Sequence, residues 1–307
     1  MNKAMREAYG DALLEIAEDE KVVVLDADLA KATSSAKFAK EYPDRFFDMG
    51  IAEQNLMGTA AGMAISGLKP FASTFAMFAT GRAFEQVRNA ICYPKADVKI
   101  VATHAGLSPN ADGGSHQTVE DIALMRAIPN MTVLSPCDYN QAKAMIKKMK
   151  DMTGPVYIRL SRHPVIEVTE PIEDIDIKKA DVLKKGEDLC IVATGVMVAC
   201  ALEAARELEE QGIRAAVINV HTIKPLDEET ILQYAKICGR ILTVEEHSVI
   251  GGLGSAICET VTKVGNCIVE RMGILDVFGQ SGDLGELMDH YGLTDKHIVN
   301  KAKELSN

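Results

Sequence analysis

The chain has 307 residues, of which 47% are hydrophobic and 25% are charged. These proportions are typical of globular proteins and exclude a disordered or collagen-like chain. At about 150 residues per domain, this length predicts two domains. Acidic residues outnumber basic ones by 44 to 33, and the net charge of −11 argues against a general nucleic-acid-binding protein.

The hydropathy and cysteine patterns bear on where the protein resides. No stretch approaches the ~18 uninterrupted apolar residues of a membrane helix. The first ten residues, MNKAMREAYG, lack the apolar core of a signal peptide. The seven cysteines are scattered and no two form a Cys-x-x-Cys pair, which indicates reduced thiols. We therefore expect a cytoplasmic protein that does not bind a membrane.

In the first half of the chain, patterns typical of buried strands alternate with helical ones. Continuous apolar strands that alternate with helices indicate a parallel sheet covered on both faces. The predicted strands are 22–27, 98–103, 131–136 and 155–161, and the predicted helices are 3–19, 53–66, 75–92, 117–127 and 138–150.

The second half repeats this alternation. Between the halves, residues 166–185 carry Pro171 and an acidic cluster without periodicity, which indicates an interdomain linker. The sequence therefore predicts an α/β protein with two doubly wound, mostly parallel domains, at 1–165 and 186–307. In the second domain, the predicted strands are 188–195, 215–220, 240–246 and 267–271, and the predicted helices are 197–211, 227–237, 252–263 and a closing helix with Thr294 as its N-cap.

Glu53 opens a predicted helix that is rich in Ala and Gly, just after the strand-like segment RFFDM and Gly50. Small residues allow such a helix to pack closely, so we expect Glu53 to be poorly solvated. Burial raises the pKa of a carboxyl group, whereas a helix N-terminus lowers it. Taken alone, the position favours a capping glutamate in the first turn over a catalytic one.

Phe75 and Phe78 stand three residues apart at the start of the next predicted helix. This spacing is usual for side chains that pack into a core. The functional alternative is an aromatic wall for a planar ring, and spacing alone favours the core.

The segment THAGLSPNADGGSHQ, residues 103–117, connects a predicted strand to a predicted helix and contains His104, Asp112 and His116. Ligands of parallel sheets bind beyond the carboxyl ends of the strands, and a glycine-rich loop there lets side chains converge. A functional role is therefore favoured. A metal site is the weaker alternative, because the segment has no His-Glu-x-x-His pattern and no nearby Cys.

Arg162, in LSRH, follows another predicted strand. A guanidinium at this place can bind a phosphate or a carboxylate, and a surface ion pair is equally consistent. The segment GGLGS at 251–255 resembles part of a dinucleotide-binding motif, but Ile257 stands at the third glycine position. We interpret it as a closely packed helix start.

Several short motifs, taken in chain order, resemble the C-terminal half of transketolase, and more closely the C-terminal subunit of a transketolase divided into two polypeptides. The resemblance extends over nearly the whole chain. It implies a pyrimidine-binding domain at 1–165 and a transketolase C-terminal domain at 186–307. The motifs are DADLA, MGIAEQNL, STFAMF, THAGLSPNADGGSHQ, MRAIPNMTV, LSRH, VINVHTIKPLD and VEEHSVIGGLGSA.

That family uses thiamine diphosphate, which lies between a pyrimidine-binding domain and a pyrophosphate-binding domain. A Gly-Asp-Gly motif in the latter holds Mg²⁺ or Ca²⁺. This chain lacks the motif, since its nearest match, SGDLGE at 281–286, has Leu at the final Gly position. The resemblance therefore implies that a separate N-terminal subunit shares the cofactor and holds the metal, and that this chain binds no metal. A dimer of this chain within a heterotetramer is the expected assembly.

The resemblance also assigns residues to the cofactor. Glu53 matches the glutamate that contacts N1′ of the aminopyrimidine, where a carboxyl group assists proton transfer. Phe75 and Phe78 match the aromatic wall around this ring, although the next aromatic position holds Gly81. Asp28, in DADLA, matches an aspartate near the cofactor and the dimer interface.

A second group of residues matches contacts to the sugar substrate. Asp112 matches a contact to a substrate hydroxyl group. His116 matches a candidate for proton transfer near the reacting carbonyl, and His104 matches a histidine near the sugar phosphate. Arg162, Arg6 and Ser34 match phosphate contacts.

The implied activity is the reversible transfer of a two-carbon ketol unit from a ketose phosphate to an aldose phosphate, a step of the pentose phosphate pathway. Glu53, His116 and His104 are its candidate catalytic residues.

Two related enzyme classes and a non-catalytic role remain as alternatives. Deoxyxylulose-phosphate synthases share part of the 103–117 segment, but generally have Asp-Arg where this chain has Thr103 and His104. The β subunits of 2-oxoacid dehydrogenases share the divided architecture, but generally lack the His-Asp-His segment followed by Leu-Ser-Arg. A non-catalytic assembly subunit would need neither Glu53 nor these histidines.

Overall fold

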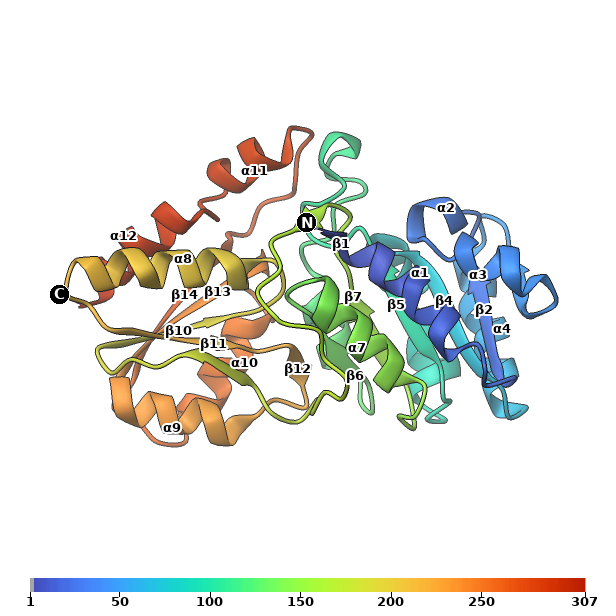
Figure 1. Cartoon of the computed structure of the whole chain (residues 1–307), viewed down its shortest axis with the longest axis horizontal. Helices are drawn as coiled ribbons and strands as arrows, with labels where there is room; N and C mark the ends of the chain where they lie inside the picture. The colour runs from blue at the N-terminus through green and yellow to red at the C-terminus, as the bar shows by residue number, and fades with distance from the viewer. Residues whose placement is uncertain (1–2, 307) are drawn as a thin grey trace.

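A seven-stranded sheet forms the centre of the first domain in the computed structural model, which describes residues 3–306 (Figure 1). The strand order is β12-β6-β7-β5-β4-β2-β3, and all neighbours except β12 and β6 pair in parallel. The strands from the first half of the chain are β2 (Val22–Asp26), β3 (Phe46–Asp48), β4 (Lys69–Phe75), β5 (Lys99–Thr103), β6 (Thr132–Leu134) and β7 (Val156–Arg159).

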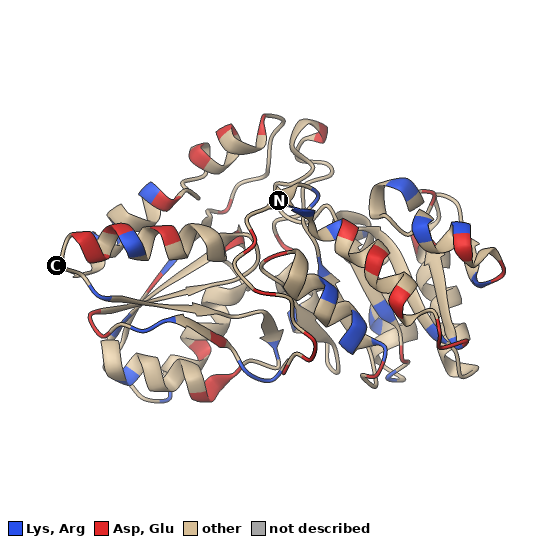
Figure 2. Cartoon of the chain, in the orientation of Figure 1, with Lys and Arg blue, Asp and Glu red and all other residues tan. Residues whose placement is uncertain are grey.

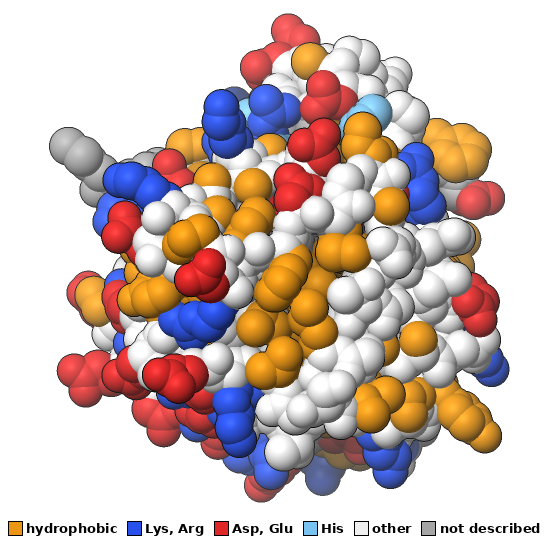
Figure 3. All heavy atoms as spheres, turned by 90° about the vertical axis from the view of Figure 1, so that its right-hand side faces the viewer, with side chains coloured by type: hydrophobic (Ala, Val, Ile, Leu, Met, Phe, Trp, Pro, Cys, Tyr) orange, Lys and Arg blue, Asp and Glu red, His pale blue; other side chains and the backbone are white. Residues whose placement is uncertain are grey.

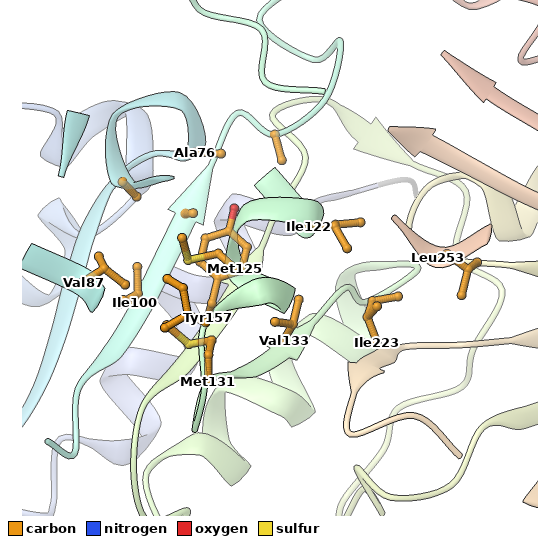
Figure 4. Packing of buried hydrophobic residues seen from close by; sticks show 14 of the residues in the cluster. Ala76, Val87, Ile100, Ile122, Met125, Met131, Val133, Tyr157, Ile223 and Leu253 are labelled. Atoms are coloured by element: carbon orange, nitrogen blue, oxygen red, sulfur yellow. The ribbon is translucent and has the colours of Figure 1, made fainter. Parts of the chain in front are cut away.

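Helices cover both faces of this sheet, which explains why every residue of β2 and β5 is buried. Alternate strand residues pack into two separate cores, one beneath α1 and α7 and the other beneath α4 and α6. Figure 4 shows the second core, where Ile100 and Val133 lie close to Met125 and Tyr157. The helices are α1 (Met5–Ile16), α2 (Ala30–Thr33), α3 (Ala36–Glu41), α4 (Glu53–Ile65), α5 (Phe84–Gln86), α6 (Asp121–Ala127) and α7 (Tyr139–Met149).

The helix predicted over 75–92 is largely confirmed, since only its first residue, Phe75, belongs to a strand. Residues Lys69–Phe75 form β4, a central strand that the sequence pattern did not reveal, because Lys, Pro, Ser and Thr interrupt its apolar residues. The remainder is helical but irregular, with π-helical turns at Phe78–Arg82 and Val87–Cys92 around the short α5. π-Helical turns are frequent at functional sites.

The second domain contains a five-stranded sheet with the order β14-β13-β10-β11-β9, in which only β9 is antiparallel to its neighbour. This confirms the predicted α/β class with two mostly parallel domains. β9 lies inside the segment 166–185, which the sequence predicts to be an interdomain linker. The elements are β9 (Asp181–Lys184), β10 (Leu189–Ala193), β11 (Ala215–Asn219), β13 (Arg240–Ser248), β14 (Ile268–Ile274), α8 (Met197–Glu210), α9 (Glu228–Cys238), α10 (Leu253–Val261), α11 (Leu284–His290) and α12 (Asp295–Ser306).

Backbone pairing and a hydrogen bond made by a member of a buried ion pair connect the two domains. β12 (Thr222–Lys224) leaves the second domain and extends the first sheet beside β6. At the junction, Arg159 Nε donates to Asp121 Oδ2 at 2.9 Å, and its Nη2 donates to the backbone oxygen of Glu246 at 3.3 Å. Both side chains of the pair are buried, so removing either partner would leave an uncompensated charge.

Charged residues of both signs are distributed over both domains (Figure 2). On α1, Glu15 pairs with Lys147 of α7 at 2.9 Å, and exposed pairs of this kind contribute little to stability. Within residues 3–306, none of the helices is both long enough and apolar enough to span a membrane.

The interpretation of GGLGS as a helix start is confirmed. α10 begins at Leu253, and the backbone amides of Leu253 and Gly254 donate to the Glu245 carboxylate at 2.7 and 2.8 Å. A carboxylate of the protein itself therefore satisfies the amides that a phosphate would bind in a dinucleotide site.

Candidate active site

The predicted site residues follow the carboxyl ends of five neighbouring parallel strands. Across the sheet, Arg162 follows β7, His104 follows β5, Phe75 ends β4, Asp28 follows β2 and Glu53 comes after β3. The carboxyl ends of parallel strands meet at one edge, which is where open α/β sheets bind ligands. The topology therefore gathers residues that are up to 134 positions apart in the chain (28 to 162).

Several residues at this edge have a strained backbone. Asp28, Ser34, His104 and Asn110 have φ angles of 61°, 71°, 59° and 40°, although none is glycine. Left-handed conformations are unfavourable for residues with a Cβ atom and tend to persist at functional sites. This strain is consistent with a binding role for the edge.

Glu53 is the first residue of α4, and only 2% of its surface is exposed. Arg82 Nη1 donates to its two carboxylate oxygens at 3.0 and 3.1 Å. The carboxylate makes no hydrogen bond to the backbone of α4 within the described part of the chain, so Glu53 does not act as a helix cap. The Arg82 guanidinium also lies over the Phe78 ring, 4.6 Å from its centroid.

The aromatic residues connect this carboxylate to the two predicted histidines. The Phe75 and Phe78 rings are stacked with centroids 6.0 Å apart. Phe75 stacks on His104 at 3.9 Å, and Phe78 meets the edge of His116 at 5.5 Å. The two phenylalanines therefore contact the rings of both predicted histidines and do not pack only among apolar side chains.

His104 is buried, and its Nδ1 lies 2.9 Å from Thr103 Oγ1. Burial, followed by the positive charges of Arg162 and Arg6, lowers the pKa of His104 to about 3. The imidazole is therefore neutral at physiological pH. It can donate or accept one hydrogen bond at a ligand without adding a charge.

Arg6 and Arg162 place two guanidinium groups beside His104. β1 (Lys3–Ala4) pairs with β8 (Pro164–Val165), which brings the start of the chain to the segment after β7. Arg6 Nε donates to the backbone oxygen of Arg162 at 3.1 Å, and Arg162 Nη1 lies 3.4 Å from Asp112 Oδ2. Arginine is suited to phosphate and other oxyanions because its planar donors can bind two oxygens together.

Asp28 and Ser34 lie on the turn after β2. Neither side chain forms a hydrogen bond or ion pair to the other predicted residues within positions 3–306, so their roles stay predictions. The turn is held by the buried Asp26, which accepts hydrogen bonds from the Leu29 amide and the Thr33 hydroxyl, each at 2.7 Å. Burial raises the pKa of Asp26 to about 6.

Three further residues of this edge were not identified from sequence as site residues. Arg82 pairs with Glu53, His163 Nε2 lies 3.3 Å from Asn110 Oδ1, and Gln117 Nε2 donates to the backbone oxygen of Asn110 at 3.3 Å. His163 could have been found from its place beside Arg162, and Gln117 from its place at the end of the 103–117 segment. Arg82 carried no signal, because its partner is 29 residues away.

The alternative of a metal site at His104, Asp112 and His116 finds no geometric basis. No group of three or more His, Cys, Asp or Glu side chains is arranged to hold a metal ion in residues 3–306.

Family comparisons cover almost the whole chain. Residues 1–166 match the transketolase pyrimidine-binding domain, and residues 178–298 match the transketolase C-terminal domain. A protein of Methanocaldococcus jannaschii, provisionally named a transketolase C-terminal section, is 49% identical over 98% of this chain and 96% of its own length. The 6-deoxy-6-sulfo-D-fructose transketolase subunit of Clostridium sp. MSTE9 is 44% identical over 98% of this chain and 94% of its own.

A solved structure gives the same result. It is described as a split-gene transketolase in an inactive β4 tetramer, and it superimposes on the full length of both chains with a TM-score of 0.90 and 50% identity. The relatives named here are of similar length to this chain, and they are described as a section, a subunit or a split-gene form of transketolase. The chain therefore resembles them in length as well as in fold. The chain therefore belongs to the transketolase family, as a C-terminal section with a pyrimidine-binding and a C-terminal domain.

Proposed function

We propose that this chain is the C-terminal subunit of a two-subunit transketolase, which transfers a two-carbon ketol unit reversibly from a ketose phosphate to an aldose phosphate. The observation that carries this proposal is the composition of the sheet edge. A buried carboxylate lies beside two aromatic rings, and one of these rings stacks on a neutral histidine. Two guanidinium groups lie next to that histidine. The first part suits a cofactor ring, and the second suits a phosphorylated sugar.

The first part of the edge fits the aminopyrimidine of thiamine diphosphate. Such a ring needs an apolar surface on its faces and a carboxyl group at its edge nitrogen. Phe75 and Phe78 offer the surface, and the nearly inaccessible carboxyl group of Glu53 offers the contact. When bound, thiamine diphosphate supplies the nucleophile and the electron sink for breaking a carbon–carbon bond beside a carbonyl group.

The residues of the chain then divide into two tasks. Glu53 holds a proton at the edge nitrogen of the ring, which is an acid–base role that a carboxyl group of suitable pKa can perform. His116 and His104 contact the reacting oxygens and move protons there, and Asp112 orients a substrate hydroxyl group. Arg6 and Arg162 bind the anionic end of the sugar, with Ser34 as an additional contact. Asp28 lies between the cofactor and the interface of the dimer.

A second candidate substrate is a sulfonated ketose. The Clostridium relative is named for 6-deoxy-6-sulfo-D-fructose, and a sulfonate presents tetrahedral oxygens to arginine much as a phosphate does. We favour the phosphate because two guanidinium groups beside one site can balance a dianion, whereas a sulfonate carries a single charge.

The proposal is tested by reconstitution with an N-terminal subunit that carries the Gly-Asp-Gly motif. A ketopentose phosphate and an aldopentose phosphate should yield three- and seven-carbon products. The sulfonated ketose is assayed in parallel as the competing donor. Decarboxylation of pyruvate as the main activity would overturn the proposal in favour of a synthase or a dehydrogenase subunit, and no turnover of any donor would favour an assembly role.

The partner subunit is proposed to hold the metal and the diphosphate. This chain has no Gly-Asp-Gly segment, and only the pyrimidine end of the cofactor meets its residues in the proposed arrangement. The isolated chain should therefore bind thiamine diphosphate weakly or not at all. Micromolar, Mg²⁺-dependent binding by the isolated chain in calorimetry would contradict this assignment.

We propose that two copies of the chain pair through the outer face of α4 within a heterotetramer. Figure 3 shows hydrophobic side chains gathered on the end of the molecule where α2, α3 and α4 lie in Figure 1. Gly58 and Gly62 leave open space on α4, while Ile51 and Ile65 are 76% and 71% exposed. Closed twofold dimers are the commonest symmetric solution.

A cytoplasmic location is proposed on the ground that all seven cysteines are free thiols.

A further inference from the structure

The second domain contacts the loop that carries two of the candidate substrate residues. We call residues 104–117 the substrate loop, and residues 275–283, between β14 and α11, the bracing segment. The two run side by side at the top of Figure 1, in green and in red. Asp112 and His116 lie on the part of the substrate loop that faces this segment.

Gln117 links the two segments with its side-chain amide. It is 3% exposed, and its Nε2 donates to the backbone oxygen of Gln280 at 2.9 Å and to that of Asn110 at 3.3 Å. One amide group therefore connects two parts of the substrate loop and also connects the loop to the second domain. Ser281 Oγ adds a hydrogen bond to the backbone oxygen of Ala111 at 2.7 Å.

Two glycines allow the segments to approach this closely. A Cβ atom on Gly279 would lie 1.8 Å from Gln117 Oε1, and one on Gly114 would lie 2.4 Å from the backbone oxygen of Gly279. Neither glycine has a left-handed φ, so close contact and not backbone conformation requires the missing side chain. The two segments interlock at the tip of the substrate loop.

The second domain also holds the base of the loop. The Leu107 amide donates to Glu246 Oε1 at 2.9 Å, and a Cβ atom on Gly106 would lie 2.4 Å from the Glu246 carboxylate. Asp112 and His116 therefore lie between two points that the second domain holds.

We propose that Gln117 is a positioning residue, through which the bracing segment of the second domain sets Asp112 and His116 for the substrate. The inference rests on the proposed function for the identity of the substrate. Its structural part concerns the loop alone. Misplacement of an orienting group by about 1 Å can cost a factor of 10² in rate, so a brace of this kind has a measurable effect on catalysis.

Hydrogen exchange tests the structural part without any substrate. Gln117→Met keeps the volume and removes the amide donor, and it should speed exchange of the Gly113 and His116 amides, which close the turns of the loop. Gly279→Ala should do the same from the other domain. The matched control is Gln211→Met, because Gln211 is exposed and its side chain, among the residues that the structure describes, bonds only to Glu207. Unchanged exchange in both test variants would overturn the brace.

Kinetics of the reconstituted complex test the positioning role. In Gln117→Met, kcat/KM for a ketose phosphate should fall by about ten- to a hundredfold. If Gln117 acts through Asp112, the same change in an Asp112→Ala background should cost less than about threefold. Equal losses in the two backgrounds would mean that Gln117 only supports the fold, and the positioning role would be wrong.

The two experiments separate this inference from the proposed function. If the wild-type complex turned over no ketose phosphate while the variants sped exchange in the loop, the proposed activity would fail and the brace would stand. If the wild-type complex turned over the ketose phosphate normally while the variants left exchange in the loop unchanged, the brace alone would be overturned.

Discussion

The two ends of the candidate site are constructed differently. The cofactor end consists of Glu53, Phe75, Phe78 and Arg82, all of which come from α4, β4 and the helical turn that follows. Within residues 3–306, the hydrogen bonds and ring contacts of these side chains lie in the first domain. The substrate end also begins in the first domain, but its loop is held by Glu246 and the bracing segment of the second.

This difference indicates how the chemistry and the substrate specificity can vary separately. Changes in the second domain can move Asp112 and His116 without disturbing Glu53, since no contact of the Glu53 carboxylate reaches that domain. The relative named for a sulfonated sugar is 44% identical over 98% of this chain. We therefore expect changes in the second domain to alter the substrate end and to leave the cofactor end unaffected. The following variants test this expectation.

Glu53→Gln should have the largest effect, because it removes the acid–base group from the cofactor end. The amide keeps the shape and can still accept a hydrogen bond from Arg82, so the fold should be retained. General acid–base groups typically raise the rate by about 10²–10⁴-fold. The kcat of the reconstituted complex should therefore fall by at least about 10²-fold with every donor.

Glu85→Gln is the matched control for that variant, because Glu85 belongs to α5 and, within residues 3–306, its side chain bonds only to Gln86 and Asn89. It should leave kcat unchanged. Thermal unfolding is measured to check that both variants fold. Turnover of Glu53→Gln within threefold of wild type would remove Glu53 from the mechanism.

Glu246→Gln tests the link between the second domain and the substrate loop through its pH dependence. Burial raises the pKa of Glu246 from its ordinary value of 4.5 to about 7, against the attraction of Arg159 and the Leu107 amide. Because the pKa is raised in the folded state, the stabilisation is complete below about pH 4.5 and is lost as the pH rises through 7. At 1.36 kcal/mol per pKa unit, the change between pH 4.5 and 7 is on the order of 3 kcal/mol.

The measurement is urea unfolding of the wild type and the variant between pH 5 and 8. The wild type minus variant difference in the free energy of unfolding should decrease as the pH rises. Other buried groups, such as His247, whose pKa burial lowers to about 4, titrate in both proteins and cancel in the difference. A difference that is constant with pH would show that Glu246 does not titrate at this junction.

Arg162→Ala should weaken the substrate end while leaving the cofactor end intact. A charge-assisted hydrogen bond contributes roughly 1.5–3 kcal/mol, so KM for a phosphorylated donor should rise by about tenfold to a hundredfold. Hydroxypyruvate lacks the phosphate and should be almost unaffected. Arg206→Ala, on the exposed face of α8, is the control. Equal losses with both donors would mean that Arg162 supports the loop through Pro109 and Asp112.

The sequence allowed the fold class and the residues at strand ends to be predicted, because apolar runs and polar loops are local patterns. β4 was missed because its polar residues, Ser73 and Thr74, are buried beside other strands, which no local pattern reveals. β12 was missed for a similar reason, since its three residues become a strand only by pairing with β6 of the other domain. The Glu53–Arg82 pair and the Gln117–Gln280 contact join residues 29 and 163 positions apart, and only the folded chain brings them together.

The smallest expected effect concerns Arg82, which binds the carboxylate of Glu53 that we propose for the cofactor ring. Arg82 has half of its side chain in solvent, whereas Glu53 is 2% exposed, so breaking their ion pair costs little on the arginine side. Exposed pairs contribute about 0.2–1 kcal/mol. Removing the competitor by Arg82→Met should therefore tighten thiamine diphosphate binding by no more than about fivefold.

Calorimetric titration of the cofactor into the reconstituted complex measures this change. Arg88→Met is the control, because Arg88 lies on the same helical region and its side chain bonds only to Asn89 within residues 3–306. Tighter binding in Arg82→Met alone means that the guanidinium leaves Glu53 when the ring binds, and the ion pair is then a property of the free chain. Weaker binding would instead make Arg82 part of the bound site, stacked on Phe78 beside the ring. The cofactor end would then depend on a charged residue of its own, just as the substrate end depends on Arg162.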